Sequence, residues 1–140
     1  MKKERKLCVL VLAADRVIAR TLASVLRAGG YMAATTESDA AASRIAERIV
    51  IDAAVIDVEP DRPIDLHPAV TLHRCYPDCR ILLVCSHSQQ QEAVMLAEEA
   101  SLTCQFILRP LSRGELLAQL AAAPGVESNS RTSLRQLHAA

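Results

Sequence analysis

The chain alternates short, unbroken runs of apolar residues with longer stretches in which apolar residues recur every three or four positions. The first pattern is typical of strands covered on both faces, and the second of amphipathic helices. Strands are therefore predicted at residues 7–12, 31–36, 52–57, 80–85 and 105–108. Helices are predicted at residues 15–28, 39–48, 66–75, 88–100 and 115–122.

Capping residues support several of these helix ends. Gly29 begins a Gly-Gly pair after the first helix, a common way for a helix to end. Ser38 or Asp39 can cap the second helix, and Ser112 with Glu115 forms a capping box before the last one.

Five strand–helix units in this order predict a parallel sheet with right-handed crossovers and helices on both faces. The natural arrangement is a doubly wound α/β fold whose five-stranded parallel sheet has the order 2-1-3-4-5. Residues 1–123 should form this one domain. Residues 124–140 contain Pro, Gly and many small polar residues, which is typical of a flexible tail or linker.

Binding sites in such sheets lie beyond the carboxyl ends of the strands, where the strand order reverses, here between strands 1 and 3. Four segments follow strand ends and should converge on this place. They are Ala13-Ala14-Asp15, Asp57-Val58-Glu59, Cys85-Ser86-His87 and Arg109-Pro110.

Composition narrows the class of protein. The 140 residues include 16 basic and 16 acidic ones, so no net charge draws the molecule to nucleic acid or to a membrane surface. Two tyrosines, one phenylalanine and no tryptophan argue against base-stacking or sugar-binding platforms. Asp15 interrupts the first apolar run, so neither a signal peptide nor a membrane helix is predicted. Five cysteines without framework spacing suit a reducing compartment, and a cytoplasmic location is expected.

Two groups of residues suggest chemistry of their own, and both are incomplete. Cys75 and Cys79 lie near His73, but a zinc site needs four ligands, so these cysteines are interpreted as semi-buried thiols. The neighbours in Cys85-Ser86-His87 should point to opposite faces of a strand, an arrangement that seldom gives a nucleophile and its base. The sequence also lacks the glycine-rich nucleotide-binding motifs. No enzyme is predicted.

Three segments resemble the receiver domains of two-component response regulators, and the resemblance covers about residues 6–122. The run 52–57 resembles the strand that ends in the phosphoacceptor aspartate. The run 106–110 resembles the aromatic-x-x-Lys-Pro segment, and 28–31 the Ala-Gly-Tyr turn. The resemblance implies the flavodoxin-like receiver fold, with Asp57 as candidate phosphoacceptor, Phe106 as switch aromatic and a cis bond before Pro110.

Other pocket positions depart from the family's pattern. The acidic pair after the first strand falls on Ala13 and Ala14, and the switch Thr or Ser falls on Cys85, with Ser86 beside it. The family's Lys falls on Arg109. Only the phosphoacceptor keeps its expected identity, so the resemblance implies an impaired magnesium and phosphate pocket.

Receivers use magnesium, which prefers octahedral oxygen coordination and usually one or two carboxylates. Here the ion would retain Asp57, a backbone carbonyl near Glu59, and water. Asp15 or Glu59 could replace the lost acids; otherwise Asp15 caps the first helix and Glu59 is a solvated loop charge. No cofactor is expected, and magnesium held by Asp57 and Asp15 remains the alternative.

Loss of the acidic pair leaves Arg109 able to form a bidentate ion pair with Asp57. Such a pair would lower the pKa of the Asp57 carboxyl. Phe106 has no hydroxyl to hold its ring in water, so an inward, packed ring is expected.

Two functions are open. The first is an atypical receiver that acts in signal transduction as a protein-interaction module, with a histidine kinase or a downstream regulator as partner and no direct contact with nucleic acid or membrane. The alternative is a working phosphoacceptor at Asp57 in a phosphorelay. A homodimer is predicted through the surface of the fourth helix, fifth strand and fifth helix. Its polar contacts are expected from Gln89, Gln90, Gln91, Glu92, Glu98, Glu99, Arg113 and Gln119.

Overall fold

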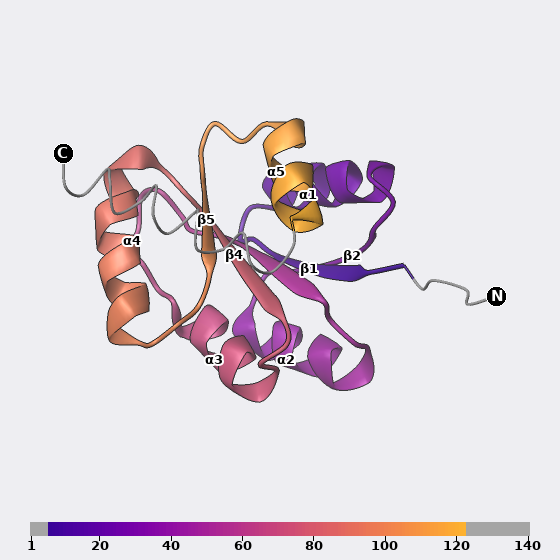
Figure 1. Ribbon diagram of the computed structural model, residues 1–140, viewed down its shortest axis with the longest axis horizontal. Coiled ribbons are helices and arrows are strands. Elements are labelled where there is room, and N and C mark those ends of the chain that lie inside the picture. Colours follow the sequence, from indigo (N-terminus) through magenta and orange to yellow (C-terminus); the bar gives the residue numbers. More distant parts are fainter. Residues whose placement is uncertain (1–5, 123–140) are drawn as a thin grey trace.

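The computed structural model describes residues 6–122, and a five-stranded parallel sheet runs through its middle (Figure 1). The strands are β1 (Cys8–Leu12), β2 (Met32–Thr36), β3 (Ala53–Asp57), β4 (Arg80–Cys85) and β5 (Gln105–Leu108). Their order is β2-β1-β3-β4-β5, and each pair of neighbours is parallel. The predicted fold class and strand order are confirmed. The predicted tail at 124–140 lies outside the described residues.

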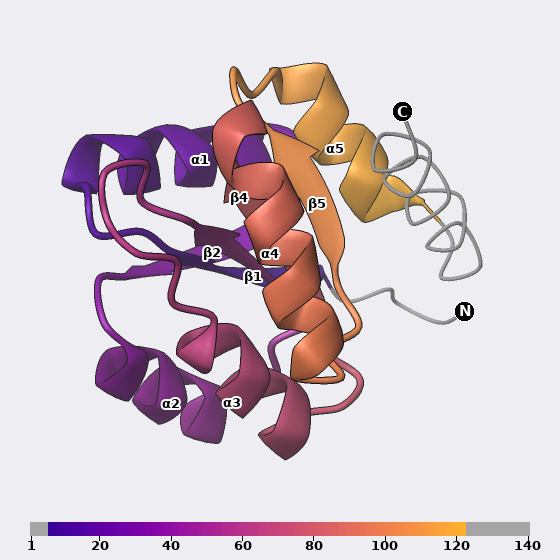
Figure 2. The same cartoon turned by 90° about the vertical axis from the view of Figure 1, so that its left-hand side faces the viewer.

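Five helices flank the sheet, each close to its predicted position. They are α1 (Arg16–Ala28), α2 (Asp39–Arg48), α3 (His67–Cys75), α4 (His87–Glu99) and α5 (Arg113–Ala121). In Figure 2, α1 and α5 lie above the sheet and α2 and α3 below it, while α4 runs across the side nearest the viewer. The last helix begins two residues earlier than predicted, because Ser112 caps its first turn by accepting a hydrogen bond from the Glu115 amide at 3.0 Å.

The sheet separates two apolar cores, which explains the unbroken apolar runs of its strands. Val9 and Val11 of β1 pack in the core beneath α1 and α5. Leu10 and Leu12, the alternating residues of the same strand, pack in the core formed with α2, α3 and α4. All four side chains are buried. A strand covered on both faces needs apolar residues at every position, as the sequence pattern indicated.

The end of α1 requires glycine at one position. Gly30 has φ of 95°, in the left-handed region that residues with a Cβ rarely adopt. The turn brings the chain back at once into β2, because the Tyr31 amide donates to the Leu26 carbonyl at 3.0 Å.

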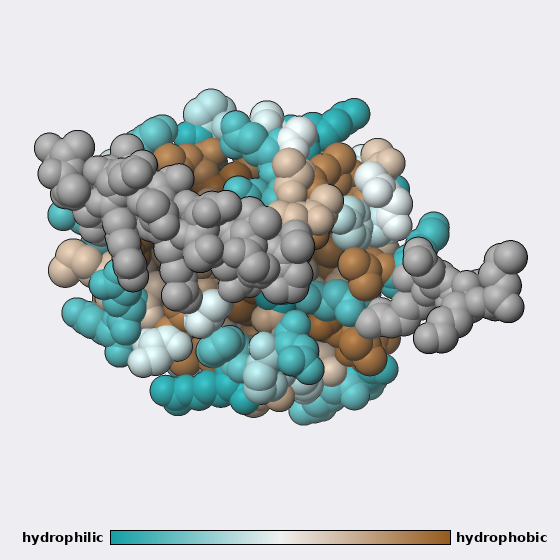
Figure 3. Space-filling model, in the orientation of Figure 1, coloured by the Kyte–Doolittle hydropathy of each residue, from teal (hydrophilic) through white to brown (hydrophobic). Residues whose placement is uncertain are grey.

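The outer surfaces fit an ordinary globular α/β domain. Figure 3 shows mainly hydrophilic residues along the lower edge of that view, where α2 and α3 lie. Among the described residues, every helix is too short or too polar to cross a bilayer.

All five cysteines are free thiols, and Cys75 is exposed while Cys79 is buried. No cluster of His, Cys, Asp and Glu suited to a metal ion occurs within residues 6–122.

Candidate functional site

The strand-end segments meet at the carboxyl edge of the sheet, as predicted. The backbone ties them together: the Val58 amide donates to the Val84 carbonyl at 2.8 Å, and the Arg109 amide donates to the Cys85 carbonyl at 2.8 Å. Ala13 and Ala14, after β1, line a hollow of about 320 Å³ together with Asp57. The loops after β1, β3, β4 and β5 thus surround one carboxylate.

Asp57 is the last residue of β3, and its side chain is only 4% exposed. Arg109, which follows β5, reaches this carboxylate: its Nη1 donates to Asp57 Oδ1 at 2.8 Å. The predicted ion pair between these residues is confirmed. A charged pair at this depth is screened less by water than a surface pair.

The pair is not bidentate, contrary to the sequence-based expectation. The second terminal nitrogen of Arg109, Nη2, donates instead to the Val58 carbonyl at 2.6 Å and to Gln89 Oε1 at 3.1 Å. A guanidinium carries five N–H donors in a fixed plane, so it can bind acceptors on two sides at once. Arg109 therefore links the acceptor loop after β3 to the start of α4.

Gln89 completes this link, a role inside the site that was not predicted from the sequence. Its Nε2 donates to the Glu59 carbonyl at 2.7 Å, while its Oε1 accepts from the Ser86 amide at 3.0 Å. The predicted place of Gln89 on a dimer surface is wrong, and so is that of Gln90, because each is only 7% exposed. The spacing Ser86-x-x-Gln89 is a capping box, a signal that could have shown Gln89 turning back toward the loop.

The two acids that could replace the lost pair, Asp15 and Glu59, have structural partners. Asp15 caps α1, with Oδ1 accepting from the Val17 amide at 2.8 Å and the Ile18 amide at 3.3 Å. Glu59 forms an ion pair with Arg62 at 3.3 Å. Both roles match the simpler interpretations of these residues.

The donor set around Asp57 fits magnesium poorly. The positions after β1 are alanines, so they offer no carboxylate. The Glu59 carbonyl already accepts from Gln89, and Asp57 already accepts from Arg109. Magnesium needs near-octahedral oxygen coordination, which these engaged groups do not provide.

The pKa of the Asp57 carboxyl shifts in the direction opposite to the sequence-based expectation. The pKa of its carboxyl is raised above the ordinary value, chiefly because burial removes water from the charged form. The hydrogen bond and the charge of Arg109 lower the pKa but do not outweigh burial, and the charges of Glu59 and Asp15 raise it further. The predicted lowering of the Asp57 pKa is therefore wrong.

This direction predicts how Asp57→Asn changes stability with pH. Native Asp57 holds its proton to a higher pH than the unfolded chain does. Its contribution to stability is present below the unfolded pKa of about 4 and is lost as the pH rises through the folded value. Asparagine does not titrate, and its carbonyl can still accept from Arg109. The free energy of unfolding of Asp57→Asn, relative to the native protein, should increase from about pH 3 to about pH 7. Urea denaturation across that range checks this, and a decrease would contradict it.

The other predicted site residues occupy supporting places. Cys85 is fully buried in the core, and burial raises the pKa of its thiol, so it is a packing residue and no nucleophile. Phe106 is half-buried: it packs against the core beneath α2, α3 and α4 and also lines a surface hollow, so it is less enclosed than expected. Ser86 caps α4. The bond between Arg109 and Pro110 is cis, as predicted.

Comparison by sequence identifies no relative: no family model matches the chain, and no curated protein matches it either. Comparison by structure finds chains with a similar fold. A signal receiver domain of an HD domain-containing protein from Pseudomonas fluorescens superimposes with a TM-score of 0.74 at 16% identity, covering 94% of this chain and 96% of that one. The chemotaxis protein CheY4 of Vibrio cholerae gives a TM-score of 0.72 at 18% identity, covering 83% of this chain and 97% of that one. The chain has the receiver fold.

A third similar structure, a response regulator receiver domain protein from Clostridium thermocellum, gives a TM-score of 0.68 at 16% identity and covers 94% of this chain and 98% of that one. The receiver fold places Asp57 at the end of β3 and Arg109 after β5, the positions that the sequence resemblance indicated. At such low identity the likeness establishes the fold alone, so the function depends on the residues around Asp57.

Proposed function

We propose that this chain is an atypical receiver that serves signal transduction as a protein-interaction module, without phosphoryl transfer and without a cofactor. One observation carries the proposal: Arg109 binds Asp57, the Val58 carbonyl and Gln89 together. The guanidinium thus engages the carboxylate and the neighbouring hydrogen-bonding groups that a metal ion and a phosphoryl group would need.

The chemistry of phosphoryl transfer supports the same conclusion. Transfer to a carboxylate depends on positioning and on neutralising the charge of the phosphoryl oxygens. Ala13 and Ala14 provide no charge to hold a metal ion, and Cys85 is buried with its thiol in the core. Arg109 offers positive charge, but its terminal nitrogens already donate hydrogen bonds to four acceptors.

One observation favours the alternative, a functional phosphoacceptor in a phosphorelay. Asp57 borders the hollow beside Ala14 and Glu59, so a small phosphodonor has a route toward its carboxylate. A working site would have to release Arg109 first.

Labelling by a small phosphodonor tests the proposal. The native protein, incubated with acetyl phosphate or phosphoramidate at millimolar magnesium, should show no added phosphoryl group by intact mass. Asp57→Asn is the matched control, because it removes the acceptor while keeping the size and an acceptor oxygen for Arg109. Magnesium-dependent labelling that Asp57→Asn abolishes would overturn the proposal in favour of the phosphorelay.

The proposed contact surface is the outer face of α4, β5 and α5. It contains a hollow of about 550 Å³ lined by His87, Phe106, Leu108 and Glu115, among others. Exposed Met95 lies on the same helix as Glu92, which is also exposed. We propose a histidine kinase, a downstream regulator or a second copy of this chain as partner, in the cytoplasm, where the free thiols would stay reduced. Light scattering that finds only monomer at high micromolar concentration would exclude the homodimer.

A further inference from the structure

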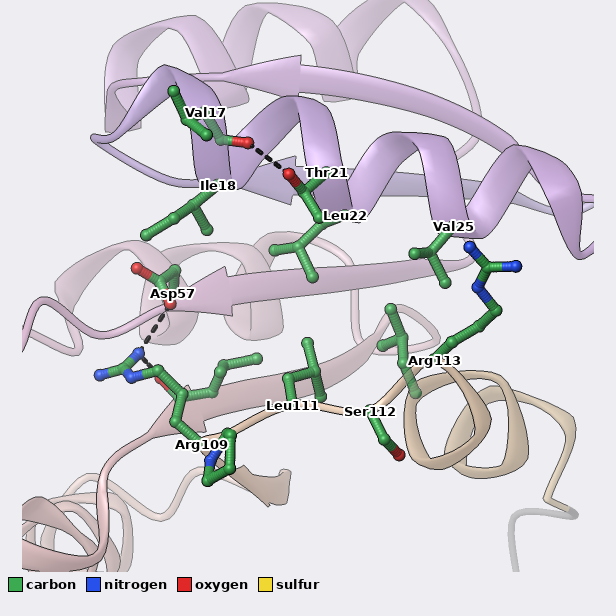
Figure 4. Close-up of a pocket in the computed structure, with 13 residues that line it drawn as sticks. Val17, Ile18, Thr21, Leu22, Val25, Asp57, Arg109, Leu111, Ser112 and Arg113 are labelled. Carbon is green, nitrogen blue, oxygen red and sulfur yellow. Dashed lines mark hydrogen bonds and ion pairs between the residues drawn. The ribbon is translucent and has the colours of Figure 1, made fainter.

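A second hollow lies on the other side of Asp57, between α1 and the segment that leads into α5. Its volume is about 250 Å³ (Figure 4). Apolar side chains form its walls: Ile18, Leu22 and Val25 from α1 face Leu111, and Leu116 also lines the hollow. Val17 at its rim is 71% exposed and adds to the apolar surface around the hollow. The hollow therefore offers apolar surface that the described chain leaves uncovered.

The two ends of the hollow carry different charges. At one end are Asp57 and Arg109, which neutralise each other through their ion pair. At the other end Figure 4 shows the Arg113 guanidinium near Val25. Among residues 6–122, Arg113 has neither an ion pair nor a hydrogen bond from its side chain. Arg113 is thus the uncompensated charge of the hollow.

The position of Arg113 argues that its charge does not serve helix stability. It is the first residue of α5, where the helix dipole disfavours a positive side chain. A cation placed beside an apolar hollow, at a small cost to its own helix, suits an amphipathic ligand whose charged group is negative.

We propose that this hollow binds a small apolar carboxylate, such as a medium-chain fatty acid, with the carboxylate at Arg113 and the apolar chain between α1 and Leu111. Arg113 fixes this direction, because its charge has no partner among residues 6–122, whereas the charge of Arg109 at the other end is already matched by Asp57. A cavity of about 150 Å³ holds benzene, so about 250 Å³ suits a chain of roughly eight carbons. The inference goes beyond the proposed function and does not depend on whether Asp57 accepts a phosphoryl group.

Titration of the native protein with sodium octanoate, followed by the backbone amide resonances, tests this site. We expect saturable shifts confined to α1 and residues 110–116. Binding should tighten with chain length from hexanoate to octanoate, by up to about fourfold for each added methylene. Octanol should bind without sensitivity to Arg113, and octylamine should bind more weakly than octanoate.

Matched variants separate the site from general apolar binding. Thr21→Trp fills the hollow from its rim, since Thr21 is exposed and lines it. Ser24→Trp places the same ring at an exposed residue of α1 that does not line the hollow. The first variant should abolish octanoate binding and the second should preserve it. Arg113→Gln should weaken octanoate binding by about two- to fivefold, as expected for an exposed ion pair, while Arg20→Gln should leave it unchanged.

Several results would overturn the proposal. They are an absence of saturable shifts at millimolar octanoate, equal binding by Thr21→Trp and Ser24→Trp, and equal affinity of the native protein for octanoate and octylamine. Native-like amide spectra of the variants, recorded before titration, verify that each substitution leaves the fold intact.

Discussion

Replacing Arg80 by alanine should lower the free energy of unfolding by about 3 kcal/mol. Arg80 begins β4, and its guanidinium donates to the Leu120 carbonyl at 2.8 Å and to the Gln119 carbonyl at 2.7 Å. It also donates to Gln105 Oε1 at 2.5 Å. Carbonyls at the carboxyl end of a helix have no N–H donors within the helix. Arg80 therefore supplies the hydrogen-bond donors that α5 itself lacks.

The loss should be large because Gln105 would be left behind. Gln105 is 1% exposed, and its Nε2 donates to Gln119 Oε1 at 2.7 Å. Without Arg80, the Gln105 side-chain oxygen keeps no partner in this network and no ready access to water. An unsatisfied buried polar group costs about 1–3 kcal/mol, and hydrogen bonds from a charged donor contribute about 1.5–3 kcal/mol.

Urea denaturation at neutral pH measures this effect. Arg44→Ala is the matched control: Arg44 is exposed on α2, so its loss should change stability by less than about 0.5 kcal/mol. Arg80→Met keeps most of the apolar stem and removes only the donors, so it should be nearly as unstable as Arg80→Ala. A cost below about 1 kcal/mol for both Arg80 variants would show that the network contributes little.

Periodicity was enough to predict the elements of the fold and their order. A parallel strand buried on both faces must be apolar throughout, and the run at 7–12 satisfies that condition as plainly in the sequence as in the structure. The place of Asp57 followed from the same rule, because it ends such a run and the strand order reverses nearby. Local hydrogen bonding also made the cap formed by Asp15 predictable.

Polar side chains inside the fold could not be placed in the same way. Gln89 and Gln105 have the composition of surface residues, and their burial depends on partners 30 and 14 residues away along the chain. Sequence spacing does not reveal partners so far apart, and the capping box of Ser86 and Gln89 indicates only the contact between those two residues. The pKa direction of Asp57 failed for a related reason: the charge of Arg109 is visible in the sequence, whereas the loss of water around the carboxylate is not.

Restoring the missing pocket groups should convert the protein into one that binds beryllofluoride, a mimic of the phosphoryl group, when magnesium is present. The variant combines Ala13→Asp, Ala14→Asp, Cys85→Thr and Arg109→Lys. The two acids would supply carboxylates for magnesium, and threonine would donate a hydrogen bond to the mimic. Lysine would retain one positive charge at position 109. It would also remove the hydrogen bonds that the Arg109 guanidinium donates to the Val58 carbonyl and to Gln89.

These substitutions should act as a unit, so single reversions should do little. The native protein should show no magnesium-dependent binding at millimolar magnesium, and the combined variant should show saturable binding by titration calorimetry. Ala13 is 1% exposed, so a carboxylate there is crowded and poorly solvated. The variant should therefore be less stable than the native protein without metal, by about 1–3 kcal/mol. Magnesium should restore part of that loss, because it binds only the folded site.

A fifth substitution, at Gln89, extends this experiment. The Gln89 amide holds the Glu59 carbonyl, which lies beside the restored acids, so Gln89→Ala should free that oxygen and strengthen binding. Magnesium-dependent binding of beryllofluoride by the native protein would overturn the proposal that the pocket is impaired. Suppose that the variant with four substitutions and the variant with five are both folded and that neither binds beryllofluoride. The missing side chains then do not explain the loss of phosphoryl chemistry. The backbone of the loops after β1 and β3 would then have to close the pocket by itself. The native residues Ala13, Ala14, Cys85 and Arg109 would in that case be a consequence of the closure and not its cause.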